Sequence, residues 1–180
     1  MLQVDESKLT SKYNEIKGYL DYYNKYGQPL VDEYTADLDT KVKDINTYLY
    51  NIRELNLDFD VVSLQRIVMD LSSIIYFTTS RLEQIKLLAD MAKVNYKSQY
   101  NQMFTSRQGA AKQEDRKFTN DQLKALAEQD AIEEELVSFV YDHVADVIEA
   151  KIDAAYELLK ACSKSLSAEI QAMQTFKVGG

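Results

Sequence analysis

The sequence predicts an all-α protein, an extended antiparallel array of about four long helices with coiled-coil-like packing. The main observation is an apolar stripe between Val61 and Met103 that recurs at alternating spacings of three and four residues. A helix with this period can bury one face along its whole length, here roughly 65 Å at about 1.5 Å per residue. The stripe consists of Leu64, Val68, Leu71, Ile75, Thr78, Leu82, Ile85, Ala89, Ala92, Tyr96 and Gln99.

Two helices are expected before this one. Gly27 and Pro29 lie between two periodic segments and indicate a turn, with Pro29 in the first turn of the second helix. Residues 56–60 should then reverse the chain, with Asp58 or Asp60 as the cap of the third helix. The two stripes are Leu9, Tyr13, Ile16, Leu20 and Tyr23, and Val31, Tyr34, Leu38, Val42, Ile45, Leu49 and Ile52. Residues 1–104 are therefore predicted to form a three-helix region.

A basic loop over 105–118 and one long helix over 119–177 should follow. The loop segment contains Gly109 and has no sustained stripe, whereas Thr119 and Gln122 have the spacing of a capping box. Glycine and proline are absent from 119–177. The stripe of this last helix is closer to an eleven-residue repeat than to a heptad. We therefore expect it to pack on the third helix over part of its length and to leave apolar surface for another subunit.

Length and composition favour one structural unit, although two unlike lobes of one helical array would also fit 180 residues that are 46% hydrophobic. The lone Cys162 excludes an internal disulfide framework and fits a reducing compartment. The first residues lack the pattern of a secretory signal, and Arg66 and Asp70 interrupt the most apolar stretch. We expect a cytoplasmic protein that does not bind a membrane.

Charge is distributed unevenly along the chain, and the net charge is −8. Residues 93–124 hold seven basic and three acidic groups, net +4, whereas residues 125–157 hold one basic and ten acidic groups, net −9. Cations beside aromatic rings suit sequence-tolerant binding of single-stranded nucleic acid. A solvated loop with its rings in the core is the simpler interpretation. The candidate nucleic-acid-binding residues are Lys93, Tyr96, Lys97, Tyr100, Arg107, Lys112, Arg116 and Lys117.

The acidic segment suggests a protein-facing surface. Its carboxylates at Asp142, Asp146, Glu149 and Asp153 step by four, three and four residues and so line one helical face. A dinuclear metal site would need a Glu-x-x-His pair, but a valine stands three residues before His143, so no metal or cofactor is expected. The candidate protein-interface residues are Asp142, Asp146, Ile148, Glu149, Ile152, Asp153 and Leu159.

Catalytic chemistry finds no support in the sequence. Cys162 and His143 are nineteen residues apart on one expected helix, roughly 28 Å at about 1.5 Å per residue, so they cannot act as nucleophile and base within one chain. Glycine-rich phosphate loops, paired metal-ligand spacings and serine elbows are all absent. The sequence predicts a protein that is not an enzyme and has no catalytic residues.

The order of these features resembles the UvsY family of phage recombination mediators, which load a recombinase onto single-stranded DNA. The resemblance covers about residues 66–174. It rests on the run Lys-Val-Asn-Tyr-Lys-Ser-Gln-Tyr at 93–100, the polar segment around Gly109, Phe118-Thr119, the acidic residues 125–136 and the segment 151–159. It implies a homo-oligomer in the host cytoplasm whose long C-terminal helix mediates assembly. The basic residues named above would contact phosphates, and Tyr96 and Tyr100 would stack on bases.

A different class of protein competes with this one. A net charge of −8 fits a protein-binding module better than a strand-binding protein, because polyanion-binding domains are usually basic. Such a module could be an assembly scaffold or an inhibitor that docks on a basic protein surface. Binding to single-stranded DNA that weakens as salt rises would distinguish the two classes.

Overall fold

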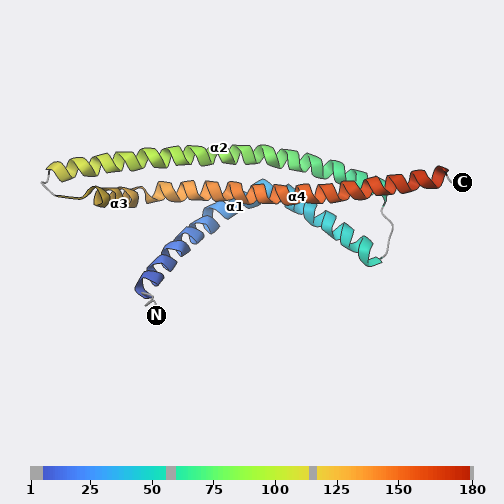
Figure 1. Cartoon of the computed structure of the whole chain (residues 1–180), viewed down its shortest axis with the longest axis horizontal. Coiled ribbons are helices and arrows are strands. Elements are labelled where there is room, and N and C mark those ends of the chain that lie inside the picture. Colours follow the sequence, from blue (N-terminus) through green and yellow to red (C-terminus); the bar gives the residue numbers. More distant parts are fainter. Residues whose placement is uncertain (1–5, 56–59, 114–116, 179–180) are drawn as a thin grey trace. The chain divides into compact units, whose positions relative to one another are not determined.

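The computed structural model describes residues 6–55, 60–113 and 117–178, and all four elements in these ranges are α-helices, as predicted. They are α1 (Glu6–Leu55), α2 (Val61–Gln113), α3 (Asn120–Asp130) and α4 (Ile132–Val178) (Figure 1). The long-helix architecture expected from the apolar stripes is therefore confirmed.

The predicted turn at Gly27 and Pro29 is wrong, because α1 continues through both residues. An internal proline removes one backbone hydrogen bond and crowds the carbonyl four residues earlier, at a cost of about 3 kcal/mol. The helix continues because it is packed on both sides of the proline, with Tyr23 7% exposed and Val31 fully buried. Tertiary packing thus overrides the local signal.

The start of α2 agrees with the prediction, but its end does not. The Asp60 carboxylate accepts hydrogen bonds from the backbone N–H groups of Val62 (3.2 Å) and Ser63 (3.0 Å), which confirms Asp60 as the cap. Asp58 lies outside the described residues. The predicted loop over 105–118 is wrong for most of its length, because α2 extends to Gln113 through Gly109. A single glycine in an exposed helix costs only about 1 kcal/mol relative to alanine.

The capping box at Thr119 is confirmed. The Thr119 hydroxyl accepts from the Gln122 N–H (3.3 Å), and the Gln122 side chain accepts from the Thr119 N–H (2.9 Å). The prediction of a single helix over 119–177 is wrong, because the chain forms two helices that are separated at Ala131. There the Ala131 N–H is shared between the carbonyls of Ala127 and Glu128, which ends α3, and α4 begins with three glutamates in its first turn. Negative charge is favourable at a helix N-terminus, and Ala131 itself is fully buried.

We predict that Thr119→Ala lowers the free energy of unfolding by about 1 kcal/mol, because the N3 backbone N–H then loses its acceptor. Thr105→Ala is the matched control, since the Thr105 hydroxyl donates only to the Asn101 carbonyl within α2. Urea unfolding followed by circular dichroism measures both. Equal midpoints for the two variants would contradict the role of the cap.

The chain divides into two compact units, and each takes segments from three long helices. Unit 1 contains Met1–Leu30 and Gln84–Ala145, and unit 2 contains Val31–Glu83 and Asp146–Gly180. One division falls between Leu30 and Val31, one residue after Pro29, so the proline lies at a boundary between units although it does not mark a turn.

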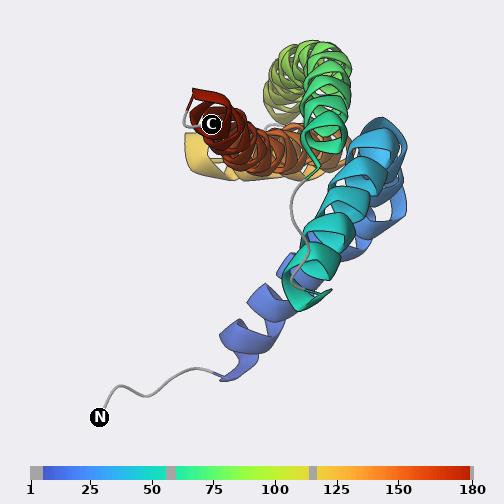
Figure 2. The same cartoon turned by 90° about the vertical axis from the view of Figure 1, so that its right-hand side faces the viewer.

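Unit 2 has a core of large aliphatic side chains. Within it α1 and α2 are antiparallel, since Lys41 pairs with Asp70 (2.7 Å) and Asp37 with Arg81 (3.8 Å). The end of α1 and the start of α2 can be followed in Figure 2. The most buried core residues are Val31, Leu38, Ile45, Leu64, Leu71, Ile75, Ile148 and Ala155.

A polar contact at the edge of the core connects α4 to α1 inside unit 2. The Lys151 ammonium donates to the Thr35 hydroxyl (3.2 Å) and also pairs with the Asp39 carboxylate. Thr35 is fully buried and donates to the Val31 carbonyl (2.8 Å). Because a buried hydroxyl needs partners, this contact favours one register of α4 on α1. Sequence patterns gave no signal for it, since its members are 112 and 116 residues apart.

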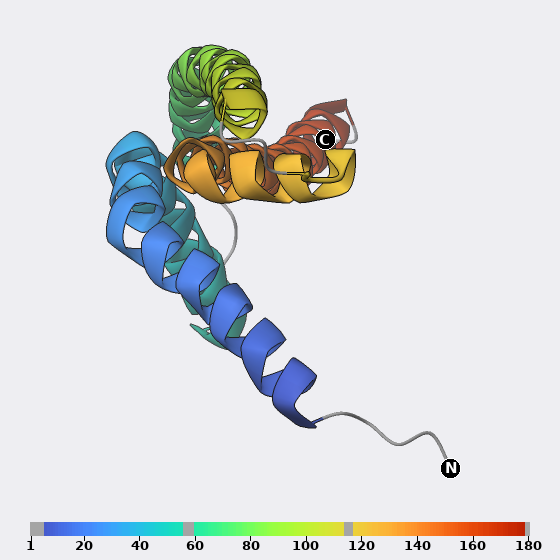
Figure 3. The ribbon, with the colours of Figure 1, turned by 90° about the vertical axis from the view of Figure 1, so that its left-hand side faces the viewer.

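Unit 1 is packed with small residues. The second half of α2 lies beside α3 and the start of α4 and runs antiparallel to them (Figure 3). The buried alanines are Ala89, Ala92, Ala111, Ala127, Ala131 and Ala145. Small side chains let helices approach closely but bury less apolar area per residue.

We predict that amide protons of α2 exchange with solvent more slowly in residues 61–83 than in residues 84–113. Nine of the eleven largest fully buried side chains belong to unit 2, and only Ile85 and Val144 belong to unit 1. Segments with fewer buried apolar contacts open at a lower free energy. Hydrogen–deuterium exchange with mass spectrometry tests this. Uniform protection along α2 would show that the helix opens as one piece.

Candidate functional site

The basic segment belongs to unit 1, and two of its predicted strand-binding cations are paired with carboxylates of the same unit. The Lys93 ammonium lies 2.7 Å from the Asp142 carboxylate of α4. The Arg107 guanidinium makes two parallel bonds to Asp130 at the end of α3, at 2.7 and 2.8 Å. Such two-point contacts are among the strongest charge-assisted hydrogen bonds. These two cations are therefore largely neutralised within the chain.

The pair of Arg107 and Asp130 shifts both side chains toward their charged forms. The hydrogen bond from Arg107 lowers the pKa of Asp130, and the Asp130 carboxylate raises the pKa of Arg107. A carboxylate with a lowered pKa stabilises the fold above its ordinary pKa, and that contribution is lost as the pH falls through the lowered value. The contact between α2 and α3 is therefore fully present at neutral pH.

The aromatic rings of the segment face the protein more than the solvent. Tyr96, Tyr100 and Phe104 form a row along α2, with ring centroids 6.4 Å apart at each step, and all three are half-buried. Burial raises the pKa of the Tyr96 hydroxyl, and the nearby Glu135 and Glu128 carboxylates raise it further. Rings beside carboxylates are poor platforms for nucleic-acid bases, because the phosphates would be repelled.

All five predicted cations that the structure describes are exposed: the paired Lys93 and Arg107, Lys97 and Lys112 on α2, and Lys117 before α3. Arg116 lies outside the described residues. Seven of the eight predicted strand-binding residues are therefore described by the structure, and these seven do not form one cationic groove.

The acidic helix face is only partly what the sequence predicted. Asp146 and Asp153 are exposed, as a protein-facing surface requires, and Leu159 is half-buried. Ile148 and Ile152, however, are 0% and 4% exposed within the single chain. Their assignment to a subunit interface is wrong, because the chain itself buries them. Asp142 is half-buried by its pair with Lys93, and Glu149 is exposed.

The lone histidine and the lone cysteine occupy different surroundings. His143 packs against Tyr23, with ring centroids 4.6 Å apart, and stacks on Phe139 at 5.9 Å, all within unit 1. Cys162 is 2% exposed in unit 2, and burial raises the pKa of its thiol, which disfavours the reactive thiolate. Among the described residues, no group of three His, Cys, Asp or Glu side chains is placed to share a metal ion.

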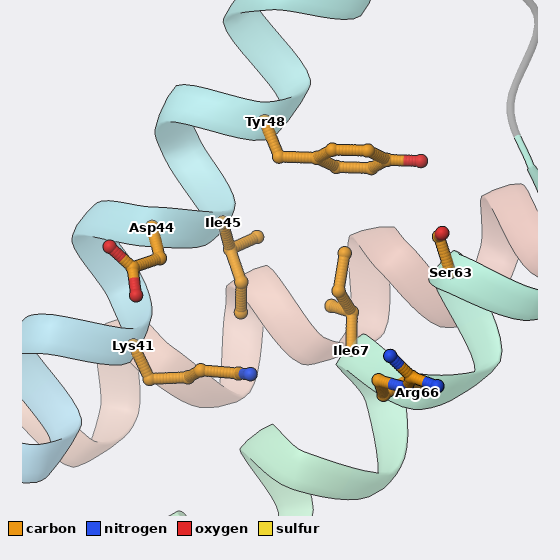
Figure 4. Close-up of a pocket in the computed structure, with 7 residues that line it drawn as sticks. All are labelled: Lys41, Asp44, Ile45, Tyr48, Ser63, Arg66 and Ile67. Carbon is orange, nitrogen blue, oxygen red and sulfur yellow. The ribbon is translucent and has the colours of Figure 1, made fainter.

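A small pocket in unit 2 offers little chemistry. It has a volume of about 240 Å³, and Ile45 and Ile67 supply apolar walls under the ring of Tyr48 (Figure 4). Two of its polar groups are already engaged, since Lys41 pairs with Asp70 and the Ser63 hydroxyl donates to Asp60. The pocket is also lined by Asp44 and Arg66, whose opposite charges balance.

The sequence interpretation missed a second apolar surface on α2. In unit 1 it contains Leu87, Met91 and Val94, which are 61%, 60% and 69% exposed, and Leu88 at 38%. We call these four residues the outer face. The same helix also exposes Val62, Met69, Tyr76 and Phe77 in unit 2. The only signal for it in the sequence was three apolar residues at heptad spacing, at 87, 91 and 94, between the polar residues 84 and 98 of the same pattern.

Helix α2 is long and apolar enough to cross a membrane when judged by length and composition alone. Of the residues in its most apolar stretch, 22% are buried inside the protein. A single such helix is weak evidence, because core helices of water-soluble proteins pass the same test. That the protein does not bind a membrane stays a prediction.

No family model, curated protein or solved structure matches this chain. Its function is therefore proposed from its own residues.

Proposed function

We propose that this chain is a non-enzymatic protein-binding module, an assembly scaffold that binds helical protein segments through the outer face of α2. The observation that carries this proposal is the outer face itself, where three large apolar side chains are each at least 60% exposed within two helical turns. Contiguous exposed apolar surface of this kind is typical of protein interaction sites. A straight helix offers such a surface in the form that another helix can cover.

Electrostatics favour a protein partner over a nucleic acid. The net charge is −8, and two of the predicted strand-binding cations, Lys93 and Arg107, are paired with Asp142 and Asp130. A polyanion would have to compete with these carboxylates at close range. The acidic residues at the start of α4 add further repulsion. A protein partner with a neutral or basic surface neither competes with these carboxylates nor is repelled by the acidic residues of α4.

Photo-crosslinking in the expressing cell tests this proposal. A photoreactive amino acid at position 91 should form crosslinks to protein. The same amino acid at position 154, an exposed alanine on α4, is the matched control and should form far fewer. Equal crosslinking at both positions, or crosslinks at position 91 to lipid alone, would overturn the proposal.

The recombination-mediator interpretation is the competing proposal, and it concerns the exposed cations. If Lys97, Lys112 and Lys117 contact a strand, replacing all three with glutamate should abolish binding. The loss of about three phosphate contacts should also flatten the dependence of log affinity on log salt by roughly two units. Fluorescence anisotropy with a labelled single-stranded oligonucleotide over a salt series measures this. We expect wild-type protein to show no binding at physiological salt, and strong salt-dependent binding would favour the mediator.

A further inference from the structure

We infer that residues 87–98 of α2 pair antiparallel with the same residues of a second copy of this chain. The inference rests on the proposed function and names the partner of the outer face. All residues involved lie on one helix within unit 1.

The residue spacing of the outer face suits a helical occupant. A shallow, open depression on α2 is lined by Asp90, Met91, Val94, Asn95 and Ser98. Four of these, at 91, 94, 95 and 98, have the spacing i, i+3, i+4 and i+7. Four residues at this spacing form the hole that receives one side chain of a facing helix in a coiled coil.

The face also supplies the side chains that fill such a hole. In its heptad, positions 84, 91 and 98 are equivalent to a, and positions 87 and 94 are equivalent to d. Antiparallel helices set each a residue against a d residue of the partner helix. In the register where Met91 meets Val94 of the second copy, Leu87 meets Ser98. A large residue then faces a small one in the outer layers, and the two-fold axis repeats every contact.

Charge selects the antiparallel arrangement. Asp90 and Lys97 occupy the g positions beside this seam, and both are exposed. In the register above, g residues face one another across the seam. Asp90 of each copy therefore lies opposite Lys97 of the other, which gives two symmetric ion pairs. A parallel pair would place Asp90 against Asn95 and Lys97 against Gln102, with no ion pair at either position.

Light scattering of the full chain tests the pairing. Wild-type protein at tens of micromolar should have twice the chain mass of 20.7 kDa, and Met91→Glu should be a monomer with unchanged helix content. Lys97→Glu should weaken the dimer about tenfold, because both ion pairs become repulsive, and the added change Asp90→Lys should restore it. Wild-type protein that is monomeric, or a charge swap that fails to restore the dimer, would overturn the inference.

Disulfide trapping determines the orientation. With Cys162→Ser as background, a chain carrying Leu87→Cys mixed with a chain carrying Ser98→Cys should form a linked dimer on oxidation. Either chain oxidised by itself should not, whereas a parallel pair would give the opposite result and overturn the inference. If the crosslinks at position 91 lead only to a different protein, the dimer fails while the proposed function stands. If position 91 gives no protein crosslinks, both fail.

Discussion

Replacing Ile148 with lysine should unfold the protein at ordinary temperatures rather than dissociate an assembly. Ile148 is completely buried in the core of unit 2, so the substitution removes a large aliphatic side chain and places an ammonium group among apolar neighbours. A buried charge that lacks a partner is among the most destabilising changes known, and we expect a loss of about 4 kcal/mol or more in the free energy of unfolding. Thermal unfolding followed by circular dichroism measures this.

The matched control is Ala154→Lys, at an exposed position of the same helix, which should leave the unfolding midpoint nearly unchanged. Light scattering on both variants separates the two interpretations of Ile148. A lysine variant at 148 that keeps its helix content and only loses mass would restore this residue to a subunit interface.

The apolar stripe of α2 predicted most of the residues that this helix buries, although Val68 and Tyr96 are only half-buried. Leu64, Leu71, Ile75 and Ile85 are each 1% exposed or less, as an apolar stripe of that period requires. The helix caps were also predictable, because a capping side chain bonds to backbone N–H groups only two or three residues away. Local chemistry is therefore readable wherever all partners lie within one helical turn.

The errors arose where distant residues decide the local structure. Pro29 and Gly109 would interrupt an isolated helix, but packing on both sides of Pro29 and a low cost at Gly109 let α1 and α2 continue. Ala131 carries no breaking signal at all, and yet α3 ends there. Single-residue propensities amount to about 1 to 3 kcal/mol, which the packing of a long helix readily exceeds.

The candidate site was less predictable than the fold, because charge summed along a segment does not show which charges meet in space. The segment 93–124 has a net charge of +4, but Arg107 bonds to Asp130, 23 residues away, and Lys93 to Asp142. The same limit explains why Ile148 and Ile152 were wrongly assigned to a subunit interface. Their stripe showed that they would be buried, but periodicity does not distinguish burial by the same chain from burial by another.

Gly27→Ala should destabilise the protein, although alanine is the better helix former. A Cβ atom at this position would lie 2.5 Å from Cδ2 and 2.7 Å from Cε2 of the Tyr23 ring, and 3.2 Å from Cγ2 of Val144. The Tyr23 ring is 7% exposed and packs edge-on against His143, so it cannot move aside without disturbing that contact. Overpacking of this kind costs about 1–3 kcal/mol, more than the intrinsic gain from removing a glycine.

Gly18→Ala is the internal control, and it should change the free energy of unfolding in the opposite direction. Among the described residues, no atom outside the local helix backbone lies within 4 Å of a Cβ placed at Gly18, so the same substitution in the same helix should stabilise the protein by about 0.5–1 kcal/mol. Urea unfolding of the two variants against wild type measures both changes. Two stabilised variants would mean that α1 does not approach Val144 closely at Gly27. Two destabilised variants would mean that Gly18 has a close neighbour as well. Opposite signs would show that the space taken by the Tyr23 ring and Val144, and not helix propensity, explains the glycine at 27.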